Sequence, residues 1–375
     1  MLNTMSEFAP HLIKRRPLHV LVCPDQPSWA FDNIANNISR HAGRNRVSKL
    51  YMQDVIGNER LFFETLLLKR VDLCHLFWRE DLFYLLHPRT IANVAWQLGF
   101  DYEAMVRAIN SCAFTTSVYD HLFSTSAEIQ ERRGGFAMAD GYTVSSRKLY
   151  SIYAAEPDCP SPDLVIADGV DAERFSPGKR VRPTGAPFAV GWVGNSAWGR
   201  QSQGFDVKGY DRLFQPMLTE LARRGLHAEP VVADSQTNRV QFEDMPEIYR
   251  QMDVFVCTSA MEGTPNPVLE AMASGLPVIS TDVGIVPEVF GDLQQRFIIH
   301  EPTPEKFAAA AEELLGDEGL RRALGDENRE RTLQWTWEIK TRDWWPFWEQ
   351  VMARAMAPRE AIRREQHLCA LAGSL

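Results

Sequence analysis

Two glutamates, Glu262 and Glu270, stand with seven residues between them in a segment whose composition indicates an anion site. Pro267 suits the first turn of a helix, and the apolar residues that follow it give that helix a buried face. Gly275 suits the end of the helix, and the apolar run 277–279 restarts the chain as a buried strand. A helix N-terminus beside the end of a strand binds anions through its free N–H groups. The segment therefore predicts a site for an anionic ligand with a carboxylate on each side.

The loop between the two glutamates is short of backbone donors, because Pro265 and Pro267 carry no N–H. The remaining backbone donors belong to Gly263, Thr264, Asn266 and Val268. We expect the Asn266 amide and the Thr264 hydroxyl to make up for the missing N–H groups. The two prolines also restrict φ, which suits a binding loop that must be rigid before its ligand arrives.

Four segments of the chain resemble the motifs of one known family and occur in the same order as in that family. They are 168–175, then Lys208 with Gly209, then 253–259, then the segment from Glu262 to Glu270. Together they resemble the retaining GT-B glycosyltransferases of family 4, the group 1 glycosyltransferases, whose donor motif is Glu-x7-Glu. The resemblance covers roughly residues 18–350 and is strong in the second half and weak in the first. Two glutamates at this spacing in isolation usually mark an exposed helix face, so the other three segments carry the argument.

The resemblance implies a role for each part of the donor site. Glu270 holds the ribose hydroxyls of a nucleoside diphosphate sugar, Glu262 contacts the sugar, and Lys208 binds the phosphates. Negative charge builds on the departing diphosphate, and cationic side chains and helix N-termini stabilise it without metal. The sequence contains no Asp-x-Asp motif. We therefore expect a metal-independent reaction without a cofactor, with UDP or GDP as the nucleotide.

One phosphate ligand of the family is replaced. The family usually has an arginine directly after the Val-Gly pair that ends the first strand of its second domain, here Val193 and Gly194, but the next residue is Asn195. The loop from there to Lys208 is longer than usual and contains Arg200. Two interpretations remain open for Arg200, a substitute phosphate ligand or an ordinary surface arginine.

The first half of the chain departs further from the family. A histidine usually ends one of its strands close to the donor sugar and the acceptor. In the matching segment Tyr119 takes the histidine's place, Asp120 keeps the usual acid, and His121 comes one residue late. His121 is either a substrate contact redirected by a turn or a plain loop histidine. The family's glycine-rich loop after the first strand is also absent, and residues 24–32 replace it.

Short apolar runs alternate with helical segments through both halves of the chain, which predicts parallel sheets. The predicted strands are 18–23, 73–77, 113–118, 142–144 and 164–166, then 188–193, 229–232, 254–257, 278–280 and 297–299. The fold class is α/β, with two doubly wound Rossmann-like domains facing across a cleft, the GT-B architecture. Ligands of such sheets bind outside the carboxyl ends of the strands.

We expect an acceptor-side domain at residues 1–182 and a donor-binding domain at 183–335, joined by a proline- and glycine-containing linker at 180–187. Residues 336–375 should pack back on the first domain. Their dense tryptophans suit burial better than sugar stacking, because tryptophan is usually well buried.

The bulk composition narrows the function classes. A chain of 375 residues that is 45% hydrophobic is long enough for two cores. Residues 1–182 hold 21 basic and 21 acidic side chains, and the rest of the chain holds 19 and 28, so no large basic surface for nucleic acid is expected. The six cysteines are scattered without a Cys-x-x-Cys pair, and no run reaches the ~18 apolar residues of a spanning helix. We therefore expect a cytoplasmic location.

A further expectation concerns membranes. Residues 40–49 contain three arginines and a lysine, which suit either a peripheral contact with the inner face of an anionic membrane or a solvated helix face.

The sequence thus predicts a retaining glycosyltransferase that moves a sugar from a nucleoside diphosphate to a saccharide or lipid-linked acceptor, in bacterial cell-surface glycan or polysaccharide synthesis. Two alternatives stay open. One is a catalytically silent GT-B module that binds a glycan or a partner enzyme, and the other is a GT-B nucleotide-sugar 2-epimerase.

Overall fold

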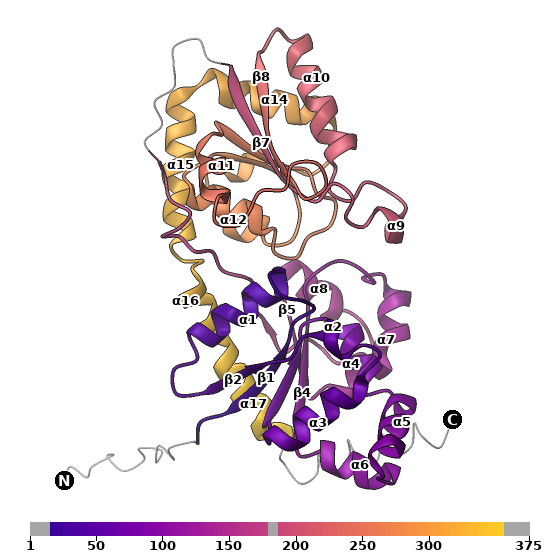
Figure 1. The fold of residues 1–375 in the computed structure, drawn as a ribbon. Helices are drawn as coiled ribbons and strands as arrows, with labels where there is room; N and C mark the ends of the chain where they lie inside the picture. The colour runs from indigo at the N-terminus through magenta and orange to yellow at the C-terminus, as the bar shows by residue number, and fades with distance from the viewer. Residues whose placement is uncertain (1–15, 179–186, 356–375) are drawn as a thin grey trace, which may run out of the picture.

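The computed structural model describes residues 16–178 and 187–355, which form two α/β domains stacked end to end (Figure 1). The first domain is built on a six-stranded sheet of order β2-β1-β3-β4-β5-β6, and the second on a five-stranded sheet of order β11-β10-β9-β7-β8. Every strand pair is parallel. The order of the strands reverses between β1 and β3 in one sheet and between β7 and β9 in the other, which are the places where such folds bind ligands.

The strands have the following bounds: β1 His19–Cys23, β2 Arg46–Lys49, β3 Leu73–Leu76, β4 Ala113–Val118, β5 Gly141–Val144, β6 Leu164–Val165, β7 Phe188–Gly194, β8 Ala228–Asp234, β9 Val254–Cys257, β10 Val278–Thr281 and β11 Ile298–Ile299. All ten predicted strands are therefore present, and the expected fold class is confirmed. The prediction missed β2, because Arg46–Lys49 is a polar edge strand without an apolar run.

Helices connect these strands. Those of the first domain are α1 Ala30–Arg40, α2 Met52–Val55, α3 Glu59–Lys69, α4 Arg79–Leu85, α5 Pro88–Leu98, α6 Tyr102–Ile109, α7 Ser126–Met138 and α8 Arg147–Ala154. Those of the second are α9 Arg200–Gln203, α10 Gln215–Arg223, which follows a π-helical turn at Tyr210–Phe214, α11 Met245–Arg250, α12 Asn266–Ala273, α13 Val286–Val289, α14 Pro304–Gly316 and α15 Glu318–Thr332. Two more, α16 Trp337–Lys340 and α17 Trp344–Ala355, follow α15.

The first sheet is covered on both faces, because successive strand residues point to opposite sides. Val20 and Val22 of β1 pack with α1 and α17, whereas Leu21 and Cys23 belong to a core with α3, α5 and α6. Trp348 of α17 is fully buried in the first of these cores. Figure 1 shows α17 beside the first-domain sheet although it follows the second domain in the chain. The burial of Trp348 fits packing rather than sugar stacking.

Helix α12 forms as its residues predict. Pro267 lies in its first turn, and Gly275 follows its end with a φ of 74°, a left-handed conformation that glycine adopts without strain. Its residues Val268, Leu269 and Met272 are fully buried. The N-terminus of α12 is thereby held at the edge of the second sheet that faces the first domain.

Several expectations meet the structure only in part. The predicted linker falls mainly on residues 179–186, outside the described residues, so the domain boundaries stay predictions.

The basic cluster 40–49 is divided between the end of α1, a turn and β2, and Lys49 is turned inward to a salt bridge with Asp32 at 2.7 Å. The cluster is therefore not one helix face, and the peripheral membrane contact stays a prediction. Within 16–178 and 187–355 no helix is long and apolar enough to cross a membrane.

Candidate active site

Lys208 lies at the switch point of the second sheet, where its position is fixed by two hydrogen bonds. Its backbone oxygen accepts from the hydroxyl of Thr258 at 2.7 Å, and that hydroxyl in turn accepts from the indole N–H of Trp192 at 3.1 Å. The next residue, Gly209, has a φ of 70°, and a Cβ there would lie 2.3 Å from the Thr258 carbonyl oxygen. The glycine at 209 is therefore required by the close packing of this loop against the residue that follows β9.

The ammonium group of Lys208 points to the first glutamate of the motif. Its nitrogen lies 2.5 Å from Oε1 of Glu262 and 4.9 Å from the ring centre of Trp198. The two charged side chains are only 19% and 16% exposed. The structure thus brings together the predicted phosphate ligand and the predicted sugar ligand as an ion pair.

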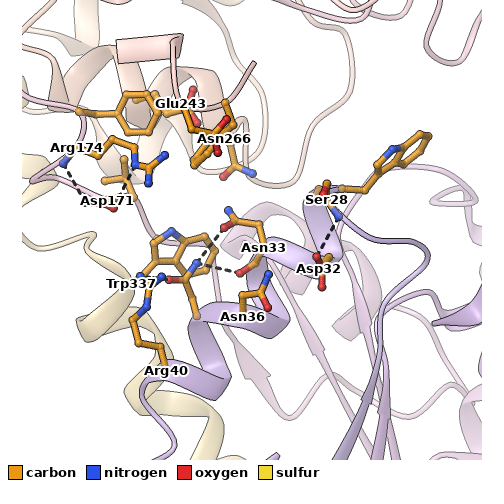
Figure 2. A pocket seen from close by; sticks show the side chains of 18 of the residues that line it. Ser28, Asp32, Asn33, Asn36, Arg40, Asp171, Arg174, Glu243, Asn266 and Trp337 are labelled. Atoms are coloured by element: carbon orange, nitrogen blue, oxygen red, sulfur yellow. Dashed lines mark hydrogen bonds and ion pairs between the residues drawn. The ribbon is translucent and has the colours of Figure 1, made fainter. Parts of the chain in front are cut away.

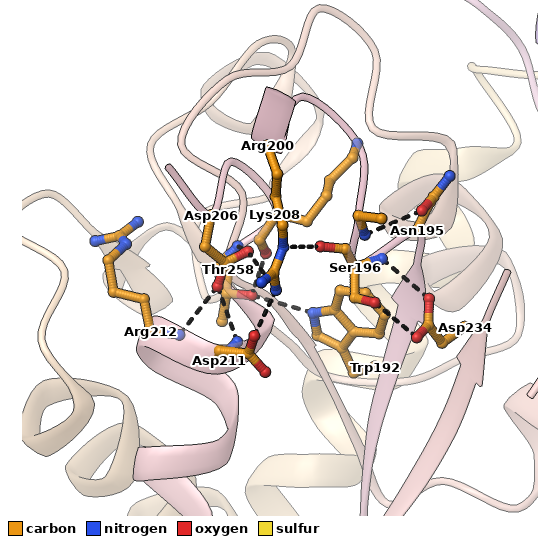
Figure 3. A network of polar contacts seen from close by, with 12 residues as sticks. Trp192, Asn195, Ser196, Arg200, Asp206, Lys208, Asp211, Arg212, Asp234 and Thr258 are labelled. Atoms are coloured by element: carbon orange, nitrogen blue, oxygen red, sulfur yellow. Dashed lines mark hydrogen bonds and ion pairs between the residues drawn. The ribbon is translucent and has the colours of Figure 1, made fainter. Parts of the chain in front are cut away.

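Arg200 is engaged elsewhere. Its guanidinium lies 2.5 Å from a carboxylate oxygen of Asp211 and 3.7 Å from one of Asp206, and its Nε donates to the Ser196 carbonyl oxygen (Figure 3). This geometry agrees with the reading of Arg200 as a structural surface arginine. A role as a phosphate ligand would require these contacts to open, and it stays a prediction.

Asn195 stabilises the loop that follows β7. Its side-chain oxygen accepts from the backbone N–H of Ala197 at 3.1 Å and from the amide of Gln236 at 3.0 Å. The carbonyl oxygen of Gly194, the last residue of β7, accepts from the backbone N–H of Ser235. Asn195, which stands where the resemblance leads us to expect an arginine, therefore closes a turn.

The loop between the glutamates packs closely against the first domain. A Cβ on Gly263 would lie 1.9 Å from the carbonyl oxygen of Tyr119 and 2.2 Å from the hydroxyl oxygen of Ser145, both in the first domain. On its other side, the Gly263 carbonyl oxygen accepts from the backbone N–H of Ile285. No side chain fits at this position without moving one domain relative to the other.

Two polar residues of this loop contact Asp168, in the segment that follows the first sheet. The hydroxyl of Thr264 accepts from the backbone N–H of Asp168 at 3.3 Å, and the Asn266 amide donates to its carboxylate at 3.4 Å. Burial raises the pKa of Asp168 to about 7. The side-chain oxygen of Asn266 is buried and has no hydrogen-bond partner among the described residues.

One expected donor is already used. The backbone N–H of Val268 donates to the carbonyl oxygen of Pro265 at 2.9 Å in the first turn of α12. In this conformation Val268 therefore does not offer this N–H to a ligand, and its place in the donor site stays a prediction. Pro265 and Pro267 shape the loop but donate nothing.

Glu270, the second glutamate, opens onto a cavity between the domains. One of its carboxylate oxygens accepts from the hydroxyl of Tyr249 at 2.7 Å. The surrounding protein raises the pKa of this carboxyl to about 7, and the Tyr249 hydrogen bond opposes that shift. Its other oxygen is left to accept a hydrogen bond from a hydroxyl in the cavity.

The first domain contributes Tyr119, Asp120 and His121 after β4. The Tyr119 ring packs on Phe31 at 5.2 Å between centres, and its hydroxyl is buried without a partner among the described residues. The carboxylate of Asp120 accepts from the Leu122 backbone N–H, and burial raises its pKa. His121 is also largely enclosed, and its Nε2 has no partner among the described residues.

Electrostatics links these residues to the second domain. Burial, aided by the charge of Lys148, lowers the pKa of His121 to about 4, while the Glu262 carboxylate opposes this shift. The same carboxylate contributes to the raised pKa of Asp120. Glu262 therefore lies within electrostatic range of both residues, and His121 is a neutral imidazole at pH 7.

A cavity of about 800 Å³ separates the domains on the side where Glu270 lies (Figure 2). Its second-domain wall includes Phe242, Glu243, Asn266 and Glu270. The opposite wall consists of Ser28, Trp29 and the length of α1, and Trp337 and residues 169–171 also line the cavity. Its volume is within the ~300–1,000 Å³ of small-molecule sites.

Comparison with known proteins finds a family match in the second domain. Residues 236–331, which hold both glutamates, match the family described as glycosyl transferases group 1. This part of the chain carries the group 1 glycosyl transferase signature. Among curated relatives, spore coat protein SA of Bacillus subtilis is 34% identical over 109 residues, 28% of this chain and 29% of that protein. The O-antigen chain mannosyltransferase B of Escherichia coli is 32% identical over 133 residues, 35% of this chain and 33% of that protein.

A longer match is the MMP alpha-(1->4)-mannosyltransferase of Mycolicibacterium hassiacum, 25% identical over 57% of this chain and 55% of that protein. The curated relatives named here are thus matched over about a third to a half of their length. Solved structures match over nearly the whole chain. A glycosyltransferase from Rickettsia africae has a TM-score of 0.63, 12% identity, and coverage of 90% of this chain and 99% of that one. Anabaena Alr3699/HepE, solved with UDP and glucose, has a TM-score of 0.60, 12% identity, and coverage of 89% and 100%.

Reasoning from the sequence missed one charged residue that lies beside Asp120. Arg79 begins α4 directly after β3, is fully buried, donates to the Leu122 carbonyl oxygen and lies 3.6 Å from Asp120. Its Nε and Nη1 have no hydrogen-bond partner among the described residues. The signal available in the sequence was its place just after the predicted strand 73–77, at the carboxyl end of a strand beside the switch point.

Proposed function

We propose that this protein is a retaining, metal-independent group 1 glycosyltransferase that uses a nucleoside diphosphate sugar, with UDP or GDP as the nucleotide. The acceptor is a saccharide or a lipid-linked acceptor, in bacterial cell-surface glycan or polysaccharide synthesis. The observation that carries the proposal is the ion pair of Lys208 with Glu262 at 2.5 Å, because the next residue, Gly263, packs against Tyr119 of the first domain. The UDP and glucose held by the Anabaena protein are consistent with such a donor.

In the proposed reaction, Glu270 accepts hydrogen bonds from the ribose, and the Lys208 ammonium turns from Glu262 to the diphosphate. Charge that develops on the leaving phosphate is then stabilised by a preorganised cation. The acceptor hydroxyl attacks on the leaving-group face, and its proton passes to the departing phosphate. His121, neutral at pH 7, and Asp120 border the place where the acceptor hydroxyl must lie.

The test is release of nucleotide from a panel of UDP-, GDP-, dTDP- and CMP-sugars, with and without crude lipid-linked acceptor. The proposal expects slow release with one donor class, unchanged by EDTA, and a product whose anomeric configuration equals that of the donor by NMR. Loss of activity in EDTA would overturn the metal-independent part, and an inverted anomer would overturn the retaining part.

A silent binding module is the second candidate, favoured by Asn195 in place of an arginine and by the internal contacts of Arg200. A silent module would be stabilised by nucleotide in a thermal-shift measurement, because ligand binding to the native state raises stability, yet would release none from any donor. A 2-epimerase would instead convert the donor sugar while nucleotide and sugar stay joined.

A further inference from the structure

The cavity beside Glu270 has an unexpected second wall. Helix α1 belongs to the first domain, yet Asn33, Asn36 and Arg40 line the cavity across from Glu243 and Asn266 of the second (Figure 2). These three residues recur at helical spacing, so they share one face of α1. Ile34 and Ile38 of the same helix are buried in the first-domain core. The fold thus turns an amide-bearing helix face toward the predicted ribose ligand.

The two asparagine amides on this face are oriented by internal hydrogen bonds. The side-chain oxygen of Asn33 accepts from the Asn37 amide at 3.1 Å, and that of Asn36 accepts from the Lys49 ammonium at 2.8 Å. With the oxygens occupied, the NH2 groups are the free ends, and among the described residues they have no partner. Two preoriented donors therefore border the cavity.

The opposite wall offers complementary groups. Phe242 is 42% exposed and lines the cavity, and the Arg174 guanidinium lies 4.8 Å from the centre of its ring. Glu243 adds a carboxylate acceptor, and the Asn266 oxygen is the buried acceptor without a partner. A flat heteroaromatic ring with hydrogen-bonding edges fits an exposed aromatic face, amide donors and carboxylate acceptors. Glu270, the predicted ribose ligand, lies in the same cavity.

We infer that the nucleobase of the donor binds in this cavity between Phe242 and helix α1, so that Asn33 and Asn36 of the first domain help to recognise it. The inference rests on the proposed function, since it takes the ligand to be a nucleoside diphosphate sugar. Base recognition is then shared by both domains, and binding of the nucleoside favours their closure. The diphosphate lies apart from this cavity, at Lys208, which is not among its lining residues.

The test compares the full chain with its Asn33→Ala/Asn36→Ala variant. Dissociation constants are measured by calorimetry for UDP, GDP and inorganic pyrophosphate. Two lost hydrogen bonds should weaken the preferred nucleoside diphosphate about tenfold, whereas pyrophosphate, which lacks a base, should bind as in the wild type. Asn93→Ala, at an exposed position on α5, is the matched control and should change neither constant. Phe242→Ala should weaken the same nucleotide without affecting pyrophosphate.

The outcomes separate the two proposals. If wild type binds neither UDP nor GDP, the proposed function fails and the inference fails with it. If wild type binds one of them and the double variant binds it as tightly, the inference alone is overturned. It is also overturned if the double variant raises KM for the acceptor while the nucleotide constant stays unchanged, since α1 would then face the acceptor. Equal weakening of pyrophosphate would show general damage to the site and reject base recognition.

Discussion

The ammonium nitrogen of Lys208 lies 2.5 Å from Oε1 of Glu262, although the two residues are 54 positions apart in the chain. Both side chains are largely shielded from water, so the pair is screened less than a surface ion pair. An arriving phosphate must compete with Glu262 for the same cation. The two charges of the ion pair neutralise each other. Replacing Lys208 and replacing Glu262 should therefore change nucleotide affinity in opposite directions.

Replacing the cation should cost nucleotide affinity. Lys208→Ala removes the charge-assisted contact to the diphosphate, which is worth roughly 1.5–3 kcal/mol, or about ten- to a hundredfold in Kd. Calorimetry with the preferred nucleoside diphosphate measures the change. Lys306→Ala, which removes an exposed partner of Glu301, is the control and should bind as wild type does. Unchanged affinity of Lys208→Ala would remove Lys208 from the phosphate site.

Replacing the carboxylate of Glu262 should not weaken nucleotide binding, but it should lower the rate of turnover. Glu262→Gln frees the Lys208 ammonium and removes a negative charge beside the phosphates, so the nucleoside diphosphate should bind as tightly as before or several-fold tighter. Loss of the contact to the donor sugar should lower kcat about tenfold or more. Steady-state kinetics and calorimetry on the same preparation separate the two effects. A variant with weaker nucleotide binding and normal kcat would contradict this division.

Asp168 should make stability depend on pH. Burial raises the pKa of its carboxyl from an ordinary 3.8 to about 7, so between these values the folded state binds more protons than the unfolded state. The free energy of unfolding should therefore fall as pH rises through this window. Asp168→Asn should remove this contribution and stabilise the protein at pH 8 by about 2–4 kcal/mol, because each pKa unit corresponds to about 1.4 kcal/mol.

The measurement is urea unfolding of wild type and Asp168→Asn at pH 5, 6, 7 and 8. Glu270 and Asp81 also have pKa values raised by burial to about 7, but both are unchanged in the variant, so the difference between the curves isolates Asp168. The exposed Asp292→Asn variant is the control. If the difference in the free energy of unfolding between the two proteins does not grow from pH 5 to pH 8, ionisation of Asp168 does not destabilise the folded state and the prediction is wrong.

Gly263 should be required for the closed arrangement of the domains. A methyl group there would meet the Tyr119 carbonyl oxygen at 1.9 Å, so Gly263→Ala must push the first domain away. We expect kcat to fall by more than tenfold because the site is completed by both domains, while pyrophosphate binding at Lys208 changes little. Gly134→Ala in α7, where a Cβ meets nothing within 4 Å, is the control. Full activity of Gly263→Ala would mean that this contact plays no part in catalysis.

Much of the second domain follows from local sequence. Apolar runs predicted the strands, and Pro267 and Gly275 predicted the start and the end of α12, because these preferences depend on a residue's own backbone and its near neighbours. The exception in the first domain was β2, whose four residues are mostly polar. A strand at the edge of a sheet is stabilised by its neighbour's backbone, which no local pattern reveals.

The contacts that decide function were settled by tertiary structure. The order of motif residues could suggest Lys208 and Glu262, but only the folded chain pairs them, turns Arg200 to Asp211, and occupies the Val268 N–H. The same holds for the burial of Arg79 beside Asp120 and for the amide face of α1 across from Glu270. Each of these contacts joins residues brought together by the packing of helices on two sheets or by the docking of one domain on the other. Distances of this kind depend on the whole arrangement of the chain, whereas a sequence motif records only which residue types stand near one another along it.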